Sequence, residues 1–129
     1  MSVVVGYVPN ERGKAALHAA LEETRFRGGP LVVVNSTRAD RLVDPRYAQE
    51  DGLTELEETL SRAGADYELR HFASRETAAE DLLGVAREVS AELLVIGVRR
   101  RTPVGKLLLG STAQTVILEA PCPVLAVKT

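Results

Sequence analysis

Four consecutive aliphatic residues stand at Leu31-Val32-Val33-Val34, between the glycines at 28 and 29 and the polar pair Asn35-Ser36. The run is rich in β-branched side chains and too short for a buried helix, so it predicts a strand that is buried on both faces. Similar runs recur at Val3-Val4-Val5, Leu93-Leu94-Val95-Ile96 and Val124-Leu125-Ala126-Val127. In segment 66–72, Tyr67, Leu69 and His71 alternate with Glu68, Arg70 and Phe72. This alternation predicts an edge strand with one face more exposed to solvent.

Helical patterns fill the intervals between these strands. We expect helices over residues 11–27, 50–63, 75–90 and 111–120, the third of them capped by Ser74. Pro121 ends the last helix because proline cannot continue it. Strand and helix therefore alternate along the whole chain, which predicts an open parallel sheet with right-handed crossovers. The longest irregular connection is expected from Ser36 to Gln49.

Composition narrows the class of protein. The chain has 129 residues, 45% of them hydrophobic and 26% charged, which predicts one globular domain over residues 1–129. Its net charge of −2 argues against a dedicated nucleic-acid binder. No apolar run is long enough to span a bilayer and the N-terminus shows no signal peptide, so we expect a cytoplasmic protein without a membrane partner.

The sequence after the third buried strand suggests a site for an anion. Ligands of open parallel sheets bind beyond the carboxyl ends of the strands, and Gly97 stands at one such end, where we expect it to let the backbone turn. Gly110 and Ser111 begin the last helix, whose N–H groups favour phosphate, and the hydroxyls of Ser111 and Thr112 can donate to it. The cations between them are Arg99, Arg100, Arg101 and Lys106. The alternative is a simple N-cap beside solvated arginines, and these residues alone leave both interpretations open.

On these motifs the whole chain resembles the universal stress protein family. The resemblance rests on the Gly-Ser helix start, on the final stretch 120–127 and on the arginine-rich segment 99–106, which is similar to actinobacterial members. Members of this family are single α/β domains that commonly dimerise. Many of them bind ATP through a motif of Gly, two residues, Gly, nine residues, then Gly followed by Ser or Thr.

Two positions depart from the pattern of the ATP-binding members. Gly97 and the Gly110-Ser111 pair match the motif at the right separation, but Arg100 occupies the place of the middle glycine. Arg100 either clamps a phosphate or fills the site with its side chain. The aspartate that such members carry after the first strand corresponds here to Val8, followed by Pro9 and Asn10. Asn10 or Ser36 would then supply part of the lost hydrogen bonding to the nucleoside.

The remaining polar residues show no catalytic constellation. Cys122 lies between two prolines and is expected to be a small buried residue at a strand end. His18 and His71 have no partner spaced to share a metal ion, so we expect both to be structural or surface residues. The acidic pairs Glu22-Glu23, Glu57-Glu58 and Glu80-Asp81 occur within helices and are interpreted as solvated faces. Any ATPase activity should be slow, because no candidate base is visible.

The sequence therefore predicts a flavodoxin-like, Rossmann-like α/β/α sandwich of five parallel strands in the order 3-2-1-4-5 with four helices. The resemblance implies a stress-response protein that binds ATP, with Mg²⁺, or a related adenine nucleotide as a regulatory ligand. Its expected contacts are Val8, Pro9, Asn10 and Ser36 around the nucleoside, and Gly97, Arg100, Gly110, Ser111 and Thr112 around the phosphates. We also expect a homodimer through the aliphatic last strand, which would otherwise leave an unpaired sheet edge. The alternative is a dimeric interaction protein that has lost nucleotide binding.

Overall fold

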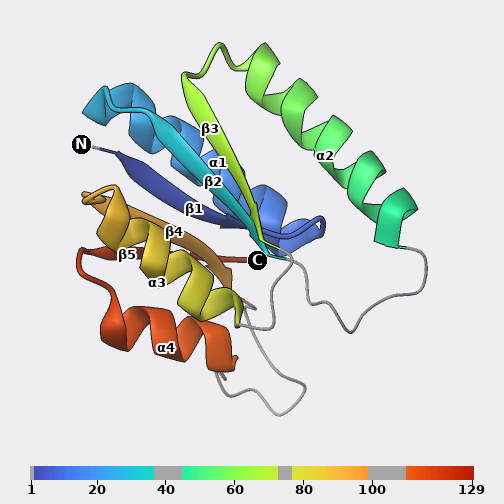
Figure 1. The fold of residues 1–129 in the computed structure, drawn as a ribbon. Helices are drawn as coiled ribbons and strands as arrows, with labels where there is room; N and C mark the ends of the chain where they lie inside the picture. The colour runs from blue at the N-terminus through green and yellow to red at the C-terminus, as the bar shows by residue number, and fades with distance from the viewer. Residues whose placement is uncertain (1, 37–44, 73–76, 99–109) are drawn as a thin grey trace.

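The structure is a computed structural model that describes residues 2–36, 45–72, 77–98 and 110–129, with side chains from residue 54 onward in the second range. The strands are β1 (Val3–Tyr7), β2 (Leu31–Ser36), β3 (Tyr67–Phe72), β4 (Leu93–Val98) and β5 (Val124–Lys128). The helices are α1 (Glu11–Arg27), α2 (Pro45–Arg62), α3 (Ala78–Glu88) and α4 (Ser111–Glu119). All strand pairs are parallel and the order is β3-β2-β1-β4-β5, so the predicted sheet is confirmed (Figure 1).

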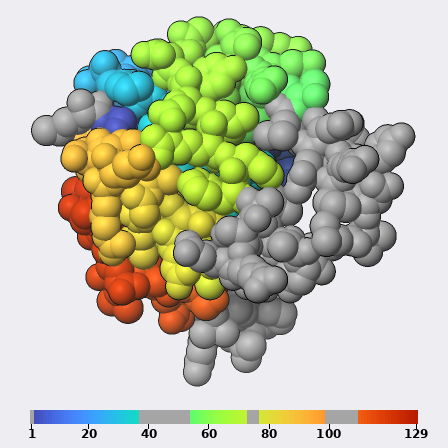
Figure 2. Space-filling model, viewed as in Figure 1, coloured from blue at the N-terminus to red at the C-terminus, as the bar shows by residue number. Residues whose placement is uncertain are grey.

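Alternate residues of each central strand pack against opposite helical layers. Val3, Val5 and Tyr7 of β1 belong to one apolar cluster with α1 and α2, whereas Val4 belongs to a second cluster with α3 and α4. The three central strands β1, β2 and β4 are covered on both faces, which explains their continuous aliphatic runs. In the space-filling view, α3 and α4 lie side by side over their face of the sheet (Figure 2).

The strands run further than their aliphatic runs suggest. β1 continues to Tyr7, β2 to Ser36 and β4 to Val98, because ladder hydrogen bonds join backbones whatever the side chains are. The pairing Tyr7↔Asn35 brings the ends of β1 and β2 level. Residues expected to lie in loops therefore form the carboxyl edge of the sheet itself.

Two predicted helix boundaries are wrong. α2 begins at Pro45 and not at residue 50, so part of the stretch expected to be irregular is helical; proline suits a first helical position. The N-cap of α3 is Thr77 and not Ser74, and its hydroxyl oxygen accepts a hydrogen bond from the Glu80 N–H at 3.2 Å. The start of α3 reflects local capping and that of α2 the preference for proline at a first helical position, and hydrophobic spacing encodes neither.

Gly84 lies on the exposed side of α3, and a Cβ atom there would meet no atom within 4 Å. Alanine restricts the unfolded chain and favours the helix, so Gly84→Ala is expected to raise the free energy of unfolding by about 0.5–1 kcal/mol. A thermal melt at matched protein concentration should show the midpoint rising by about 2–4 °C. An unchanged or lower midpoint would contradict the open geometry of this position.

Candidate functional site at the carboxyl edge of the sheet

The carboxyl ends of β1, β2 and β4 meet at one edge of the sheet. In this strand order the chain departs from β1 toward β2 and β3 and returns to β4 on the other side of β1. Such a reversal leaves a crevice beyond the strand ends, where ligands of open α/β sheets bind. Val8, Pro9 and Asn10 follow β1, Ser36 ends β2, and Gly97 is the penultimate residue of β4.

The first loop folds tightly onto the start of α1. The Asn10 N–H donates to the Val8 carbonyl at 2.8 Å, and Asn10 Oδ1 accepts from the Gly13 N–H at 3.0 Å. Asn10 is therefore the N-cap of α1, and the oxygen that was expected to face a nucleoside already serves its own helix. Val8 and Pro9 are exposed beside it.

Tyr7, the last residue of β1, lies directly before this loop. Its side chain is buried against α1 and α2, near the ion pair that Lys14 forms with Glu55 at 3.2 Å. Burial raises the pKa of the Tyr7 hydroxyl above its ordinary value, and the Glu55 carboxylate raises it further. The hydroxyl therefore stays protonated at neutral pH and remains a neutral hydrogen-bonding group.

Gly97 has a packing role that the sequence did not reveal. It lies inside β4, level with Val127 of β5, so the expected turn at this glycine is wrong. A Cβ atom at Gly97 would lie 2.3 Å from the Arg12 carbonyl oxygen, far closer than real Cβ contacts. The glycine therefore lets the first turn of α1 approach β4, whether or not a ligand binds nearby.

At the start of α4, in contrast to Gly97, the glycine has open space beside it. Gly110 is the N-cap of this helix, with extended backbone (φ −64°, ψ 163°) and no side-chain hydrogen bond, and Ser111 and Thr112 are the exposed first helical residues. A Cβ atom at Gly110 would meet no atom within 4 Å. The packing of the described residues therefore gives no reason for glycine here. The N–H groups of the first turn have no partner within the helix, as at any helix start.

Ser36 is hydrogen-bonded to Asp81, a residue whose burial the sequence did not predict. Its hydroxyl donates to Asp81 Oδ2 at 2.9 Å, and Asp81 is only 6% exposed. The Glu80-Asp81 pair was interpreted as a solvated face, which holds for Glu80 and is wrong for Asp81. Asp81 lies four residues before the buried Val85, and this spacing was the available signal that it faces inward.

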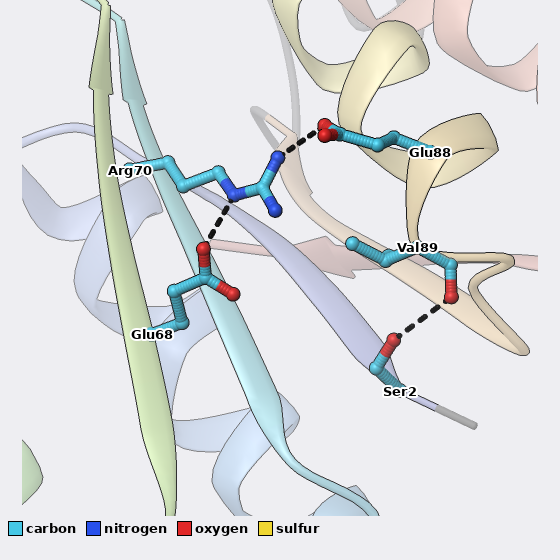
Figure 3. A network of polar contacts seen from close by, with 5 residues as sticks. All are labelled: Ser2, Glu68, Arg70, Glu88 and Val89. Carbon is cyan, nitrogen blue, oxygen red and sulfur yellow. Dashed lines mark hydrogen bonds and ion pairs between the residues drawn. The ribbon is translucent and has the colours of Figure 1, made fainter.

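A polar network fixes the other end of α3. Arg70 of β3 binds both Glu68 and Glu88, the last residue of α3, and the Ser2 hydroxyl donates to the Val89 carbonyl at 3.5 Å (Figure 3). The pKa of Arg70 is raised by its hydrogen bonds to the two carboxylates, Glu68 first. These contacts join the last turn of α3 to β3 and the residue after this helix to the start of the chain before β1.

Several predicted residues fall elsewhere. Arg100 lies outside the described residues, as do Arg99, Arg101 and Lys106. His18 and His71 are exposed, in line with the expectation of surface residues. Cys122 is partly buried against the α3–α4 cluster, and this burial raises the pKa of its thiol.

Two surface hollows lie away from this edge, in and beside the α1–α2 groove. One of about 440 Å³ is lined by His18, Leu21, Glu22, Arg25, Thr59, Arg62 and Ala63, and the other, of about 210 Å³, lies beside Gly28 and Gly64. Across the ranges that the structure describes, no three His, Cys, Asp or Glu side chains are grouped to hold a metal ion. None of the helices in those ranges has the length and apolar character needed to cross a membrane.

Comparisons with known proteins agree with this geometry. The sequence profile of the Universal stress protein family matches residues 1–128. A universal stress protein of Mycolicibacterium smegmatis is 45% identical over 126 residues, which cover 98% of this chain and 96% of the relative.

Two solved structures of similar fold carry adenine nucleotides. The universal stress protein of Archaeoglobus fulgidus in complex with dAMP has a TM-score of 0.77 and 30% identity, covering 99% of this chain and 98% of the other. A universal stress protein in complex with cAMP has a TM-score of 0.75 and 28% identity, covering 100% of this chain and 97% of the other. With the family profile spanning the chain and the sheet order in agreement, the protein described here is a member of the universal stress protein family.

Proposed function

We propose that this protein binds an adenine nucleotide at the carboxyl edge of its sheet and acts in the cytoplasm as a stress-response protein regulated by that ligand. The observation that carries the proposal is the start of α4, where a glycine N-cap has no side-chain hydrogen bond and no packing role among the described residues. Two universal stress proteins of similar fold, solved in complex with dAMP and with cAMP, support the ligand class.

In this proposal the start of α4 binds the phosphate end of the ligand. The first-turn N–H groups and the positive end of the helix dipole favour an anion, and the absence of a side chain at Gly110 lets a phosphate approach them closely. The Ser111 and Thr112 hydroxyls, both exposed, can add donated hydrogen bonds. Arg100 remains a proposed phosphate contact from its position in the sequence.

In this proposal the loop after β1 and the end of β2 contact the nucleoside end of the ligand. Val8 is 37% exposed and offers, with Pro9, an apolar surface on which a base can rest. Asn10 contributes chiefly by shaping this loop, since its Oδ1 is bonded to Gly13. ATP would bring its Mg²⁺ on the phosphates, and the protein needs no metal cage of its own for that role.

Thermal melts of nucleotide-free protein with Mg-ATP, ADP, AMP, cAMP and dAMP test the proposal directly. A ligand at a hundred times its dissociation constant adds about 2.7 kcal/mol to stability, which raises the melting midpoint by several degrees. Gly110→Val fills the space beside the first turn of α4 and is expected to weaken binding about tenfold or more. At the same nucleotide concentration the gain should then fall to about 1.4 kcal/mol or less.

The matched control is Gly84→Val, the same replacement at an exposed glycine of α3 that also meets no neighbour. Its nucleotide-dependent shift should equal that of the wild type. Equal shifts in Gly110→Val and wild type would rule out α4 as the phosphate site. No shift at millimolar nucleotide would instead support the dimeric interaction protein that has lost its ligand.

The assembly we propose is a homodimer through β5. This strand pairs only with β4 among the described strands, and its residues are half-buried or exposed. Ile117 and Leu118 of α4, the helix that precedes β5, are 41% and 83% exposed and offer further apolar surface for an interface. Pairing of two β5 strands across a two-fold axis would satisfy the edge and cover this surface.

A further inference from the structure

The buried pair formed by Asp81 and Ser36 has no part in the phosphate site. Asp81 stands in the first turn of α3 and Ser36 is the last residue of β2, 45 positions away in the sequence. Their hydrogen bond of 2.9 Å joins the start of a helix to the carboxyl edge of the sheet. A carboxylate that is 6% exposed is costly to bury unless hydrogen bonds satisfy it.

The pair lies over the ends of β1 and β2, on the same face as α4. Leu82, the residue after Asp81, packs so closely on β1 that a Cβ atom at Gly6 would lie 2.9 Å from its side chain. Ser36 stands one residue beyond the Tyr7↔Asn35 pair, at the end of β2. Leu82, Ala113 and Val116 belong to the same apolar cluster, so α3 and α4 share this side of the crevice.

Asp81 has hydrogen-bonding capacity that the described protein does not use. No ion pair among the described residues involves it, and Ser36 supplies one hydrogen bond to one of its two oxygens. An ionised carboxylate can accept about four hydrogen bonds. The loop after β1 offers no competing carboxylate, because it reads Val8-Pro9-Asn10 and the Asn10 oxygen is bonded to Gly13.

We infer that Asp81, oriented by Ser36, binds the ribose hydroxyls of the nucleotide and makes this protein selective for ribonucleotides. The inference rests on the proposed function and adds a sugar-binding residue to it. A vicinal diol presents two O–H donors at a spacing that one carboxylate can accept, and acidic side chains at the edge of nucleotide-binding α/β sheets hold ribose in this way. Because the Ser36 hydroxyl gives its only proton to Asp81, its own lone pairs can accept a further bond from the sugar.

The test compares ATP with 2′,3′-dideoxy-ATP, which lacks both hydroxyls, and with inorganic tripolyphosphate, by titration calorimetry. The wild type is expected to bind ATP about tenfold or more tightly than the dideoxy analogue, as a charged hydrogen-bond acceptor implies. Asp81→Asn keeps the size of the side chain and an oxygen for Ser36. It should weaken ATP binding about tenfold while leaving dideoxy-ATP and tripolyphosphate within twofold of wild type.

Gly84→Ala on the same helix is the matched control, and its three affinities should equal those of the wild type. If Asp81 only anchors α3, Asp81→Asn will weaken ATP and dideoxy-ATP by the same factor, which overturns the inference and leaves the proposed function standing. A wild type that binds both nucleotides equally overturns it as well, and this measurement needs no variant to fold. A wild type that binds neither nucleotide nor tripolyphosphate overturns both the inference and the proposed function.

Discussion

Gly13→Ala is expected to destabilise the protein by about 3 kcal/mol or more, because the added methyl group has no space. A Cβ atom at Gly13 would lie 1.7 Å from the Val8 carbonyl oxygen and 2.6 Å from the Val8 nitrogen. These are backbone atoms of the loop that enters α1, so no side chain can rotate away. The start of α1 and the residue that follows β1 would have to separate.

Urea unfolding followed by circular dichroism measures this loss. Gly84→Ala is the matched control, since the same atom added to a glycine of α3 meets nothing within 4 Å and is expected to stabilise. The two variants should therefore move the unfolding midpoint in opposite directions. A Gly13→Ala variant that unfolds within about 1 kcal/mol of the wild type would show that the loop after β1 relaxes freely.

The close approach of α1 to the strand ends also gives Gly97 a packing role. Gly97 matches the first glycine of the family's phosphate motif, yet its neighbour in the structure is the Arg12 carbonyl of α1. Gly13 and Gly97 both let the first turn of α1 settle against strand ends, one against β1 and the other against β4. A substitution at Gly97 would therefore disturb packing and binding together, which makes Gly110 the cleaner probe of the ligand site.

The strands were accessible from the sequence because aliphatic runs and alternation mark segments that pack against helices, whereas the order 3-2-1-4-5 was predicted with the flavodoxin-like fold and not from hydropathy. Val3-Val4-Val5 and the three similar runs each became a strand, and the alternating segment 66–72 became the edge strand β3. The ends of the strands were not accessible. Polar or small residues such as Ser36 and Gly97 continue the ladder through their backbones, and hydropathy does not register that continuation.

The site was predicted less completely for a related physical reason. A local pattern can mark a helix start such as Gly110-Ser111, but it cannot show which distant residue fills the space beside a strand end. Asp81 comes within hydrogen-bonding distance of Ser36 only because α3 crosses back over β1 and β2. The capping role of Asn10 is different, because its hydrogen bond to Gly13 is local and asparagine before a helix is a recognisable N-cap.

The proposed homodimer predicts a large effect for proline at one position of β5. In a parallel ladder, successive residues direct their N–H and C=O groups to opposite sides. The Pro123 carbonyl accepts from Leu94, and the Thr129 N–H donates to Val98, so the odd-numbered residues of β5 face β4. Ala126 is exposed and its N–H is therefore directed to the open edge of the sheet.

Ala126→Pro removes that N–H without touching the ladder to β4, and proline is tolerated on an edge strand of this kind. Each copy in an antiparallel β5–β5 pair would lose a hydrogen bond and leave a partner carbonyl unsatisfied, at a cost of about 2 kcal/mol or more for the dimer. The dissociation constant should rise about 30-fold or more in sedimentation equilibrium, with the circular dichroism spectrum unchanged. Ala126→Val keeps the N–H and should remain as dimeric as the wild type. An Ala126→Pro protein with the wild-type dissociation constant would place the contact elsewhere, and a wild type that stays monomeric at high concentration would remove the dimer from the proposal.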